Sequence, residues 1–156
     1  MPIRAFSLIL CLSLFLAACR EVNSNPSDHR FDDITLETRL NFQHTSGVEG
    51  RYLLPEIMGS GGALFDYDND GDLDIYLVNG GKLVPNQSDT TNKLFQRSAD
   101  GSYQDVTATA GLDDAGFGMG SALGDIDNDG DLDIYVSNID KDRLYLNNAD
   151  ASFSDI

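Results

Sequence analysis

The sequence has no tryptophan, few basic residues and no cysteine beyond position 19. Ten Lys and Arg residues stand against 26 Asp and Glu residues, which gives a formal net charge of −16 at neutral pH. A chain this acidic is repelled by a polyanion and gains nothing from counterion release, so nucleic acid is excluded as a partner. With Cys11 and Cys19 both near the N-terminus, the rest of the chain has no disulfide, thiol chemistry or cysteine ligand for zinc. Its hydrophobic content of 41% is too high for a disordered acidic tail.

The sequence also lacks an apolar run long enough to cross a bilayer. Residues 5–18 form its longest run, and these 14 residues fall short of the ~20 that a spanning helix needs. One basic residue before the run and small residues after it predict a secretory signal at residues 1–18. The segment ends in Leu16-Ala17-Ala18-Cys19, which resembles the lipobox of bacterial lipoproteins and implies that Cys19 is lipidated. A plain secretory signal with a chance cysteine is the alternative.

A lipidated Cys19 would anchor the exported protein in the cell envelope, because each buried CH₂ contributes roughly 0.8 kcal/mol. The resemblance to bacterial lipoproteins also implies that the protein is sorted to the outer membrane, because the residue after the cysteine is Arg20 and not Asp. Residues 20–33 are polar, and we expect residues 19–33 to form the lipidated cysteine and a flexible tether.

The remainder, residues 34–156, contains one unit twice. Gly61–Asn79 returns as Gly120–Asn138 at an offset of 59 residues, with nearly the same sequence. An aromatic-x-Asp-aliphatic pattern occurs three times, at Phe31–Ile34, Tyr103–Val106 and Phe153–Ile156. Repeats of this period are typical of propellers, solenoids and arrays.

Each repeat, at about residues 60–107 and 119–156, offers four short runs of strand length. They are residues 63–65, 73–78, 94–95 and 103–107 in the first copy, and 122–123, 132–136, 144–146 and 153–156 in the second. Lys93-Leu-Phe95 returns as Arg143-Leu-Tyr145 at an offset of only 50, which places an insertion at residues 80–91 as a loop. Four strands per unit predict an all-β fold of propeller blades, about two four-stranded antiparallel blades in an incomplete propeller.

Two Asp-rich runs carry the chemistry of these repeats. The first holds Asp66, Asp68, Asp70, Asp72 and Asp74, and the second holds Asp125, Asp127, Asp129, Asp131 and Asp133. So many carboxylates in nine residues repel one another unless a cation lies among them, and oxygen ligands in a flexible loop suit Ca²⁺ better than Mg²⁺. We therefore predict two Ca²⁺ sites, with side-chain ligands at positions one, three, five and nine. The seventh residues, Asp72 and Asp131, are expected to contribute a backbone carbonyl.

An EF-hand does not account for these loops. That motif needs a bidentate Glu at position twelve and flanking helices, whereas position twelve here is Leu77 or Val136 within an apparent strand. A pair of acidic turns without metal is the other alternative.

The repeated Asp-x-Asp-x-Asp-Gly-x-x-Asp-Ile-Tyr stretch resembles the FG-GAP/VCBS repeat, found in the calcium-loaded propeller of integrin α subunits and in bacterial surface proteins. Phe42-Gln-His44 and Leu54–Gly62 resemble the start of the cartilage acidic protein/UnbV-like family, whose members have propellers of about seven blades. Unlike members of that family, the chain stops at Ile156 within a third aromatic-x-Asp-Ile pattern. We therefore expect an N-terminal fragment or truncated gene product. Phe31–Ile34 would then be the strand that joins the last blade of a complete ring.

Three functions remain open. The first is a non-enzymatic calcium-binding envelope lipoprotein that recognises a protein or carbohydrate. The second is a module of a calcium-dependent polysaccharide-degrading enzyme, for which His44, Arg51 and Glu56 are the candidates, and the third is a fragment with no independent role. Tyr76 and Tyr135 suit packing between blades better than a stacking platform for sugars.

Overall fold

A computed structural model of the chain describes residues 31–47, 50, 52–83 and 90–156. Residues 1–33 and residues 34–156 form two separate units, and both sheets belong to the second. The expected signal peptide, Cys19 and residues 20–30 of the expected tether lie outside the described residues. Within the described ranges, no helix has the length and apolar character required to cross a membrane.

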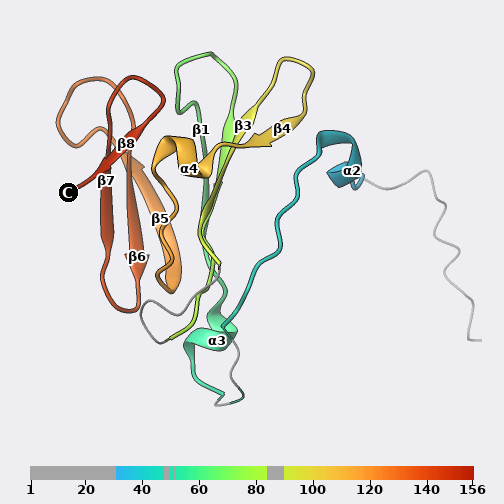
Figure 1. Cartoon of the computed structure of the whole chain (residues 1–156), viewed down its shortest axis with the longest axis vertical. Helices are drawn as coiled ribbons and strands as arrows, with labels where there is room; N and C mark the ends of the chain where they lie inside the picture. The colour runs from blue at the N-terminus through green and yellow to red at the C-terminus, as the bar shows by residue number, and fades with distance from the viewer. Residues whose placement is uncertain (1–30, 48–49, 51, 84–89) are drawn as a thin grey trace, which may run out of the picture. The chain divides into compact units, whose positions relative to one another are not determined.

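Eight strands form two antiparallel sheets, and in each sheet every strand pairs with the next one along the chain. The first sheet comprises β1 (Gly62–Phe65), β2 (Asp74–Leu77), β3 (Lys93–Arg97) and β4 (Tyr103–Asp105). The second comprises β5 (Gly118–Gly124), β6 (Asp133–Asn138), β7 (Arg143–Asn147) and β8 (Phe153–Asp155). Figure 1 shows the two sheets side by side. The prediction of two four-stranded antiparallel blades is confirmed, and the two sheets do not close a ring.

The strand register gives each sheet two distinct faces, because successive side chains of a strand point to opposite sides. One face, here called the tyrosine face, holds Ala63, Tyr76 and Leu94 in the first sheet and Ala122, Tyr135 and Leu144 in the second. The other, the isoleucine face, holds Leu64, Ile75 and Phe95 in the first sheet and Leu123, Ile134 and Tyr145 in the second. The two sheets are therefore copies of each other residue by residue.

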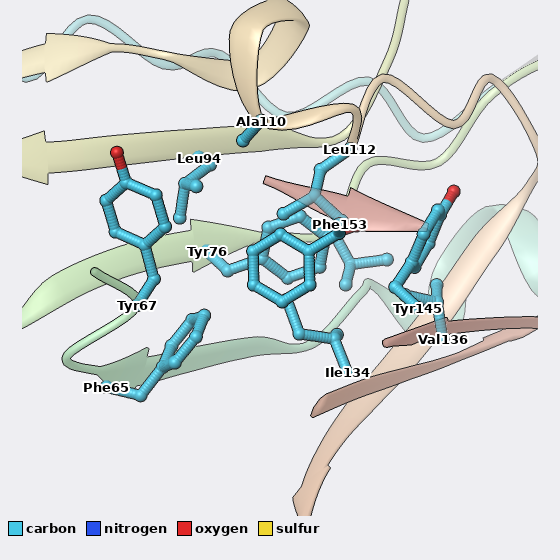
Figure 2. Close-up of a cluster of buried hydrophobic side chains, with 11 residues drawn as sticks. Phe65, Tyr67, Tyr76, Leu94, Ala110, Leu112, Ile134, Val136, Tyr145 and Phe153 are labelled. Atoms are coloured by element: carbon cyan, nitrogen blue, oxygen red, sulfur yellow. The ribbon is translucent and has the colours of Figure 1, made fainter. Parts of the chain in front are cut away.

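The core forms where the tyrosine face of the first sheet packs on the isoleucine face of the second. Tyr76 and Leu94 from one side and Ile134 and Val136 from the other are completely shielded from solvent. Figure 2 shows these side chains pointing toward one another, with Leu112 from the connection between the sheets among them. Burying aromatic and aliphatic side chains in this way contributes roughly 1.5–3 kcal/mol per residue.

The predicted packing between blades is seen for Tyr76, whereas for Tyr135 it stays a prediction. Tyr76 lies fully buried between the sheets, but Tyr135 is 40% exposed and donates a hydrogen bond from its hydroxyl to Asp142. The physical reason is position: the second sheet uses its opposite face to contact the first.

The fourth predicted strand of the first repeat ends two residues earlier than expected. β4 stops at Asp105, whose carboxylate accepts hydrogen bonds from the backbone N–H of Thr107 at 3.0 Å and from its hydroxyl at 2.5 Å. Short polar side chains that bond the backbone two residues ahead favour turns over strands. The chain therefore enters a short helix, α4 (Thr107–Ala110), before it crosses to β5.

A second short helix, α2 (Thr35–Thr38), repeats the conformation of α4 at an offset of 72 residues. Ile34 before α2 has φ −106° and ψ 15°, and Val106 before α4 has φ −116° and ψ 11°. Both helices end in a left-handed residue, Arg39 or Gly111. Residues 34–40 are thus a structural copy of residues 106–112, which connect the two sheets. The third helix, α3 (Pro55–Met58), precedes β1.

Candidate metal centre

Both Asp-rich runs lie in hairpin loops at the same end of the two sheets. The first connects β1 to β2 and the second connects β5 to β6, and Figure 1 shows both at the top. In each loop the fourth and sixth residues have positive φ: 61° at Asn69 and 90° at Gly71, and 62° at Asn128 and 101° at Gly130. Asn tolerates this conformation better than most residues and Gly adopts it freely, which explains the repeated Asn-Asp-Gly.

The first Asp of each run stabilises the curled loop by accepting hydrogen bonds from backbone N–H groups of the same loop. Its two carboxylate oxygens accept the backbone N–H groups of the fifth and sixth loop residues. For Asp66 these bonds are 3.1 Å from Asp70 and 2.8 Å from Gly71. Asp125 makes the same two bonds, both at 3.1 Å, to the corresponding residues of the second loop.

The ninth Asp of each run is fixed against the sheet. Asp74 is completely buried and accepts the N–H groups of Tyr67 at 3.1 Å and Arg97 at 2.8 Å. Burial raises the pKa of Asp74, against the opposing effect of these two N–H groups. Asp133 is held in the same way, by the N–H groups of Ile126 at 2.8 Å and Asn147 at 2.9 Å.

Three carboxylates converge in each loop. They are Asp66, Asp68 and Asp74 in the first loop and Asp125, Asp127 and Asp133 in the second, and within each set one oxygen per residue lies within 4.8 Å of the others. Oxygens that share a Ca²⁺ ion at 2.3–2.6 Å can lie up to about 5 Å apart, so both sets fit one such ion. The first, third and ninth residues of each run can therefore hold a metal ion.

The carboxylates also act on one another electrostatically. Desolvation, together with the negative charges of Asp129 and Asp133, raises the pKa of Asp127. In the first loop, burial and then the charges of Asp68, Asp74 and Asp70 raise the pKa of the Tyr67 hydroxyl to about 12. Desolvation is the largest cause of both shifts, and the neighbouring carboxylates add negative charge that a cation would relieve.

The fifth and seventh residues of each run lie outside the converging sets. Asp70 and Asp129 each use one carboxylate oxygen to accept the N–H of the seventh residue, at 2.9 and 3.0 Å. The seventh carboxylates point to basic or amide groups instead: Asp72 pairs with the Arg97 guanidinium, and Asp131 accepts the Asn69 side-chain amide at 2.7 Å. The side chains of Asp72 and Asp131 are thus engaged outside the loop centre.

Several residues that support the loops were not identified from the sequence. Gln96 donates to Asp68 at 2.5 Å, and Asn147 donates across the sheets to the Tyr67 carbonyl at 3.1 Å. The offset of 50 residues between Lys93 and Arg143 gave a signal for one pair, because it aligns Arg97 with Asn147, whose N–H groups hold the ninth Asp. For Gln96 the repeat offered no signal, since its counterpart is Leu146.

The three residues considered for catalysis have unlike surroundings. His44 is exposed, and Glu56 on α3 is 6% exposed, with its Oε1 atom lacking a hydrogen-bond partner among the described residues. Arg51 lies outside the described residues.

Comparison with known families supports the repeat assignment. A family model described as an FG-GAP-like repeat matches residues 66–136, which run from the first Asp of the first loop into β6. The matched span contains both Asp loops and the whole connection between the sheets. No curated protein matches the chain. The chain therefore carries an FG-GAP-like repeat, a module typical of propellers.

Proposed function

We propose that each Asp loop binds one Ca²⁺ ion and that the protein is a non-enzymatic, calcium-dependent recognition module. The observation that carries the proposal is the convergence of three carboxylates in both loops, at the same three positions and with the same backbone bonds. A chance acidic turn would have no reason to be built twice in the same geometry. The FG-GAP-like repeat match over the same residues adds independent support.

Calcium suits these loops better than magnesium. The loops are open hairpin connections, and the second is almost entirely exposed, so water can complete the coordination of an ion. Ca²⁺ accepts 6 to 8 oxygens in variable geometry, whereas Mg²⁺ demands a near-ideal octahedron at about 2.0–2.1 Å. The three converging carboxylates, a backbone carbonyl of Asp72 or Asp131, and water would together satisfy Ca²⁺.

In this proposal the ion stiffens one end of each sheet and presents the neighbouring loops to a protein or carbohydrate ligand. Propeller modules bind ligands through loops that a rigid set of sheets positions. We also propose that the module is lipid-anchored in the bacterial outer membrane, which the lipobox-like segment ending at Cys19 and the Arg20 that follows it support.

Calorimetric titration of the chain with Ca²⁺ tests the proposal. We expect two ions per chain for the wild type, one for Asp68→Ala and none for Asp68→Ala combined with Asp127→Ala. Asp100→Ala is the matched control, because Asp100 lies in the turn between β3 and β4 and is expected to leave the stoichiometry at two. A folded wild type that takes up no Ca²⁺, or a double variant that still binds two ions, would contradict the proposal.

The lipid anchor has a separate test. Cys19→Ala removes the thiol that would carry the lipid, so we expect the protein to leave the membrane fraction or to remain unprocessed in bacteria. Cys11→Ala is the control, because Cys11 lies inside the expected signal and should leave both processing and fractionation unchanged. Membrane association and processing that survive Cys19→Ala would rule out the lipoprotein.

A further inference from the structure

A small pocket lies where the two sheets meet, at the end away from the Asp loops. Three segments line it: residues 82–83, which follow β2, residues 114–117 of the connection between the sheets, and residues 139–143, which lead from β6 into β7. Figure 1 shows the turn from β6 to β7 at this end of the second sheet. The pocket has a volume of about 130 Å³, less than the roughly 300 Å³ at which pockets for drug-sized ligands begin. It therefore has room for one small chemical group and part of the molecule that carries it.

The pocket reverses the charge balance of the chain. Acidic residues outnumber basic ones 26 to 10 in the whole sequence, whereas three basic and two acidic side chains line the pocket. The basic ones are Lys82, Lys141 and Arg143, which are half of the six Lys and Arg residues in the described ranges. Positive charge gathered in a hollow of an otherwise acidic protein attracts an anion to that place.

Both lysines of the pocket have ammonium groups without an acidic partner. Lys93, which lies outside the pocket, pairs with Asp105 at 2.9 Å. Neither Lys82 nor Lys141 forms an ion pair within the described ranges. An ammonium group has three N–H donors and no acceptor, so both lysines can donate to a bound anion.

The third cation, Arg143, is held in place by two carboxylates. Its guanidinium donates to Asp114 at 3.4 Å and to Asp155 at 2.6 Å. The Asp114 side chain is only 3% exposed, and its carboxylate also accepts the Asn138 side-chain amide at 2.8 Å and the Gly116 N–H at 3.2 Å. A guanidinium has five N–H donors, so Arg143 keeps donors for a ligand while its position is fixed.

The pocket also offers an acceptor and apolar surface. Asp140 is exposed on the turn from β6 to β7 and forms no ion pair in the described part of the chain. Its ionised carboxylate can only accept hydrogen bonds. Leu83 and Ile139 line the pocket with aliphatic side chains, and Ile139 is 44% exposed. A bare anion is repelled by Asp140, whereas a ligand that carries hydroxyl groups beside its carboxylate makes use of both charges.

The repeated blade does not account for the charges on the turn. The offset of 50 residues that relates β3 to β7 pairs Thr90 with Asp140 and Thr91 with Lys141. The first sheet thus has two uncharged residues at these positions and still forms four strands. A blade folds without either charge, which leaves both charges for another task.

We propose that this pocket binds a single sugar acid, a hexuronic acid whose carboxylate is bound by Lys82, Lys141 and Arg143. The ring hydroxyls donate to Asp140, and the C–H groups of the ring contact Ile139. A long acidic polymer is a poor ligand, because the net charge of −16 repels a polyanion and the pocket is small. This site goes beyond the calcium proposal, since none of its residues belongs to the Asp loops.

An NMR titration of the full chain with glucuronate, in mild detergent and Ca²⁺, tests the pocket. Glucose lacks the carboxylate and acetate lacks the hydroxyl groups, so both should bind about tenfold or more weakly than glucuronate. Lys82→Gln and Lys141→Gln should each weaken glucuronate binding about tenfold, as the loss of a hydrogen bond between charged groups does. Lys93→Gln is the matched control, because it removes the same charge outside the pocket and should leave the affinity unchanged.

Asp140→Ala separates a sugar acid from a bare anion or an acidic peptide. The variant should bind glucuronate more weakly, because it loses the acceptor for the hydroxyl groups. If the pocket takes only a carboxylate, the same variant binds more tightly, because a repelling charge is gone. A peptide of four glutamates, titrated in parallel, should bind more weakly than glucuronate.

Asp68→Ala keeps this result separate from the calcium proposal, because it alters one Asp loop and should leave glucuronate binding unchanged. Three results would overturn the sugar-acid site. They are equal binding of glucuronate and glucose by the folded chain, tighter binding of glucuronate by Asp140→Ala, and an equal loss of affinity in Lys141→Gln and Lys93→Gln.

Discussion

At the scale of single residues, the Asp side chains of one loop divide into three tasks. Asp66 holds the curl through two backbone N–H groups, and Asp74 ties the loop to the sheet through two more. Asp72 balances the Arg97 side chain. These hydrogen bonds fix the first and ninth carboxylates, which are two of the three that converge in the loop.

The ninth Asp is a buried carboxylate whose ionised form a cation would stabilise. Placing a carboxylate in a buried position raises its pKa, which means that its ionised form is disfavoured there. The two N–H groups that it accepts offset this cost in part. A Ca²⁺ ion beside Asp74 would favour the ionised form further, so binding and ionisation of this residue support each other.

The roles of these loop residues could be predicted from the sequence to different degrees. The repeated Asp spacing was enough to locate both loops and the convergence of positions one, three and nine, because the curl depends on local Asn-Asp-Gly chemistry. Position five was also expected as a side-chain ligand, and that expectation stays a prediction. One of its carboxylate oxygens accepts the N–H of residue seven, a local hydrogen bond that residue spacing does not encode.

At the scale of strands and sheets, two residues at the same repeat position contribute differently to stability when only one of them is covered by another sheet. Tyr76 and Tyr135 occupy the same position in β2 and β6, each opposite an Ala and a Leu. Only Tyr76 lies between two sheets. A repeat in the sequence predicts the strands and their register, but it cannot say which copy has a neighbour on a given face.

This difference predicts unequal effects of the same substitution. Tyr76→Ala removes a fully buried ring and should cost about 3–5 kcal/mol of unfolding free energy, as large aromatic truncations in cores do. Tyr135→Ala removes a partly exposed ring and should cost less than about 1 kcal/mol. Urea unfolding at low protein concentration measures both, and equal losses would contradict the assignment of the core.

The short helices mark the limit of pattern-based prediction for elements. Residues 103–107 have the composition of a strand. The Asp105 carboxylate nevertheless accepts hydrogen bonds from the N–H and the hydroxyl of Thr107, and α4 begins there. The resemblance of α2 to α4 becomes apparent only from their backbone angles, since their sequences Thr-Leu-Glu-Thr and Thr-Ala-Thr-Ala differ at three of four positions.

At the scale of the whole molecule, the sheets are joined by an apolar core and by polar contacts at both ends, and at the end away from the Asp loops the Gly118 N–H donates to the Asn79 carbonyl. The Asn69–Asp131 bond joins the two Asp loops directly, and Asn147 reaches the carbonyl of Tyr67 within the first loop. A metal ion bound in one loop would therefore act close to the interface between the sheets. The ten Asp side chains at this end repel one another, so the apo protein should be weakest where the loops meet.

The most direct test of the calcium account is the melting temperature of the chain in EDTA and in Ca²⁺. An ion bound only by the native state at 100 times its Kd contributes about 2.7 kcal/mol, and two independent sites contribute about twice that. For a folded region of this size we expect Ca²⁺ to raise the melting temperature by about 10 °C or more over EDTA. Equimolar Mg²⁺ should raise it much less, and Asp66→Asn combined with Asp125→Asn should melt low and respond little to Ca²⁺. Identical melting curves in EDTA and in Ca²⁺, for a chain shown to be folded, would contradict the account and leave both Asp runs as ordinary acidic turns.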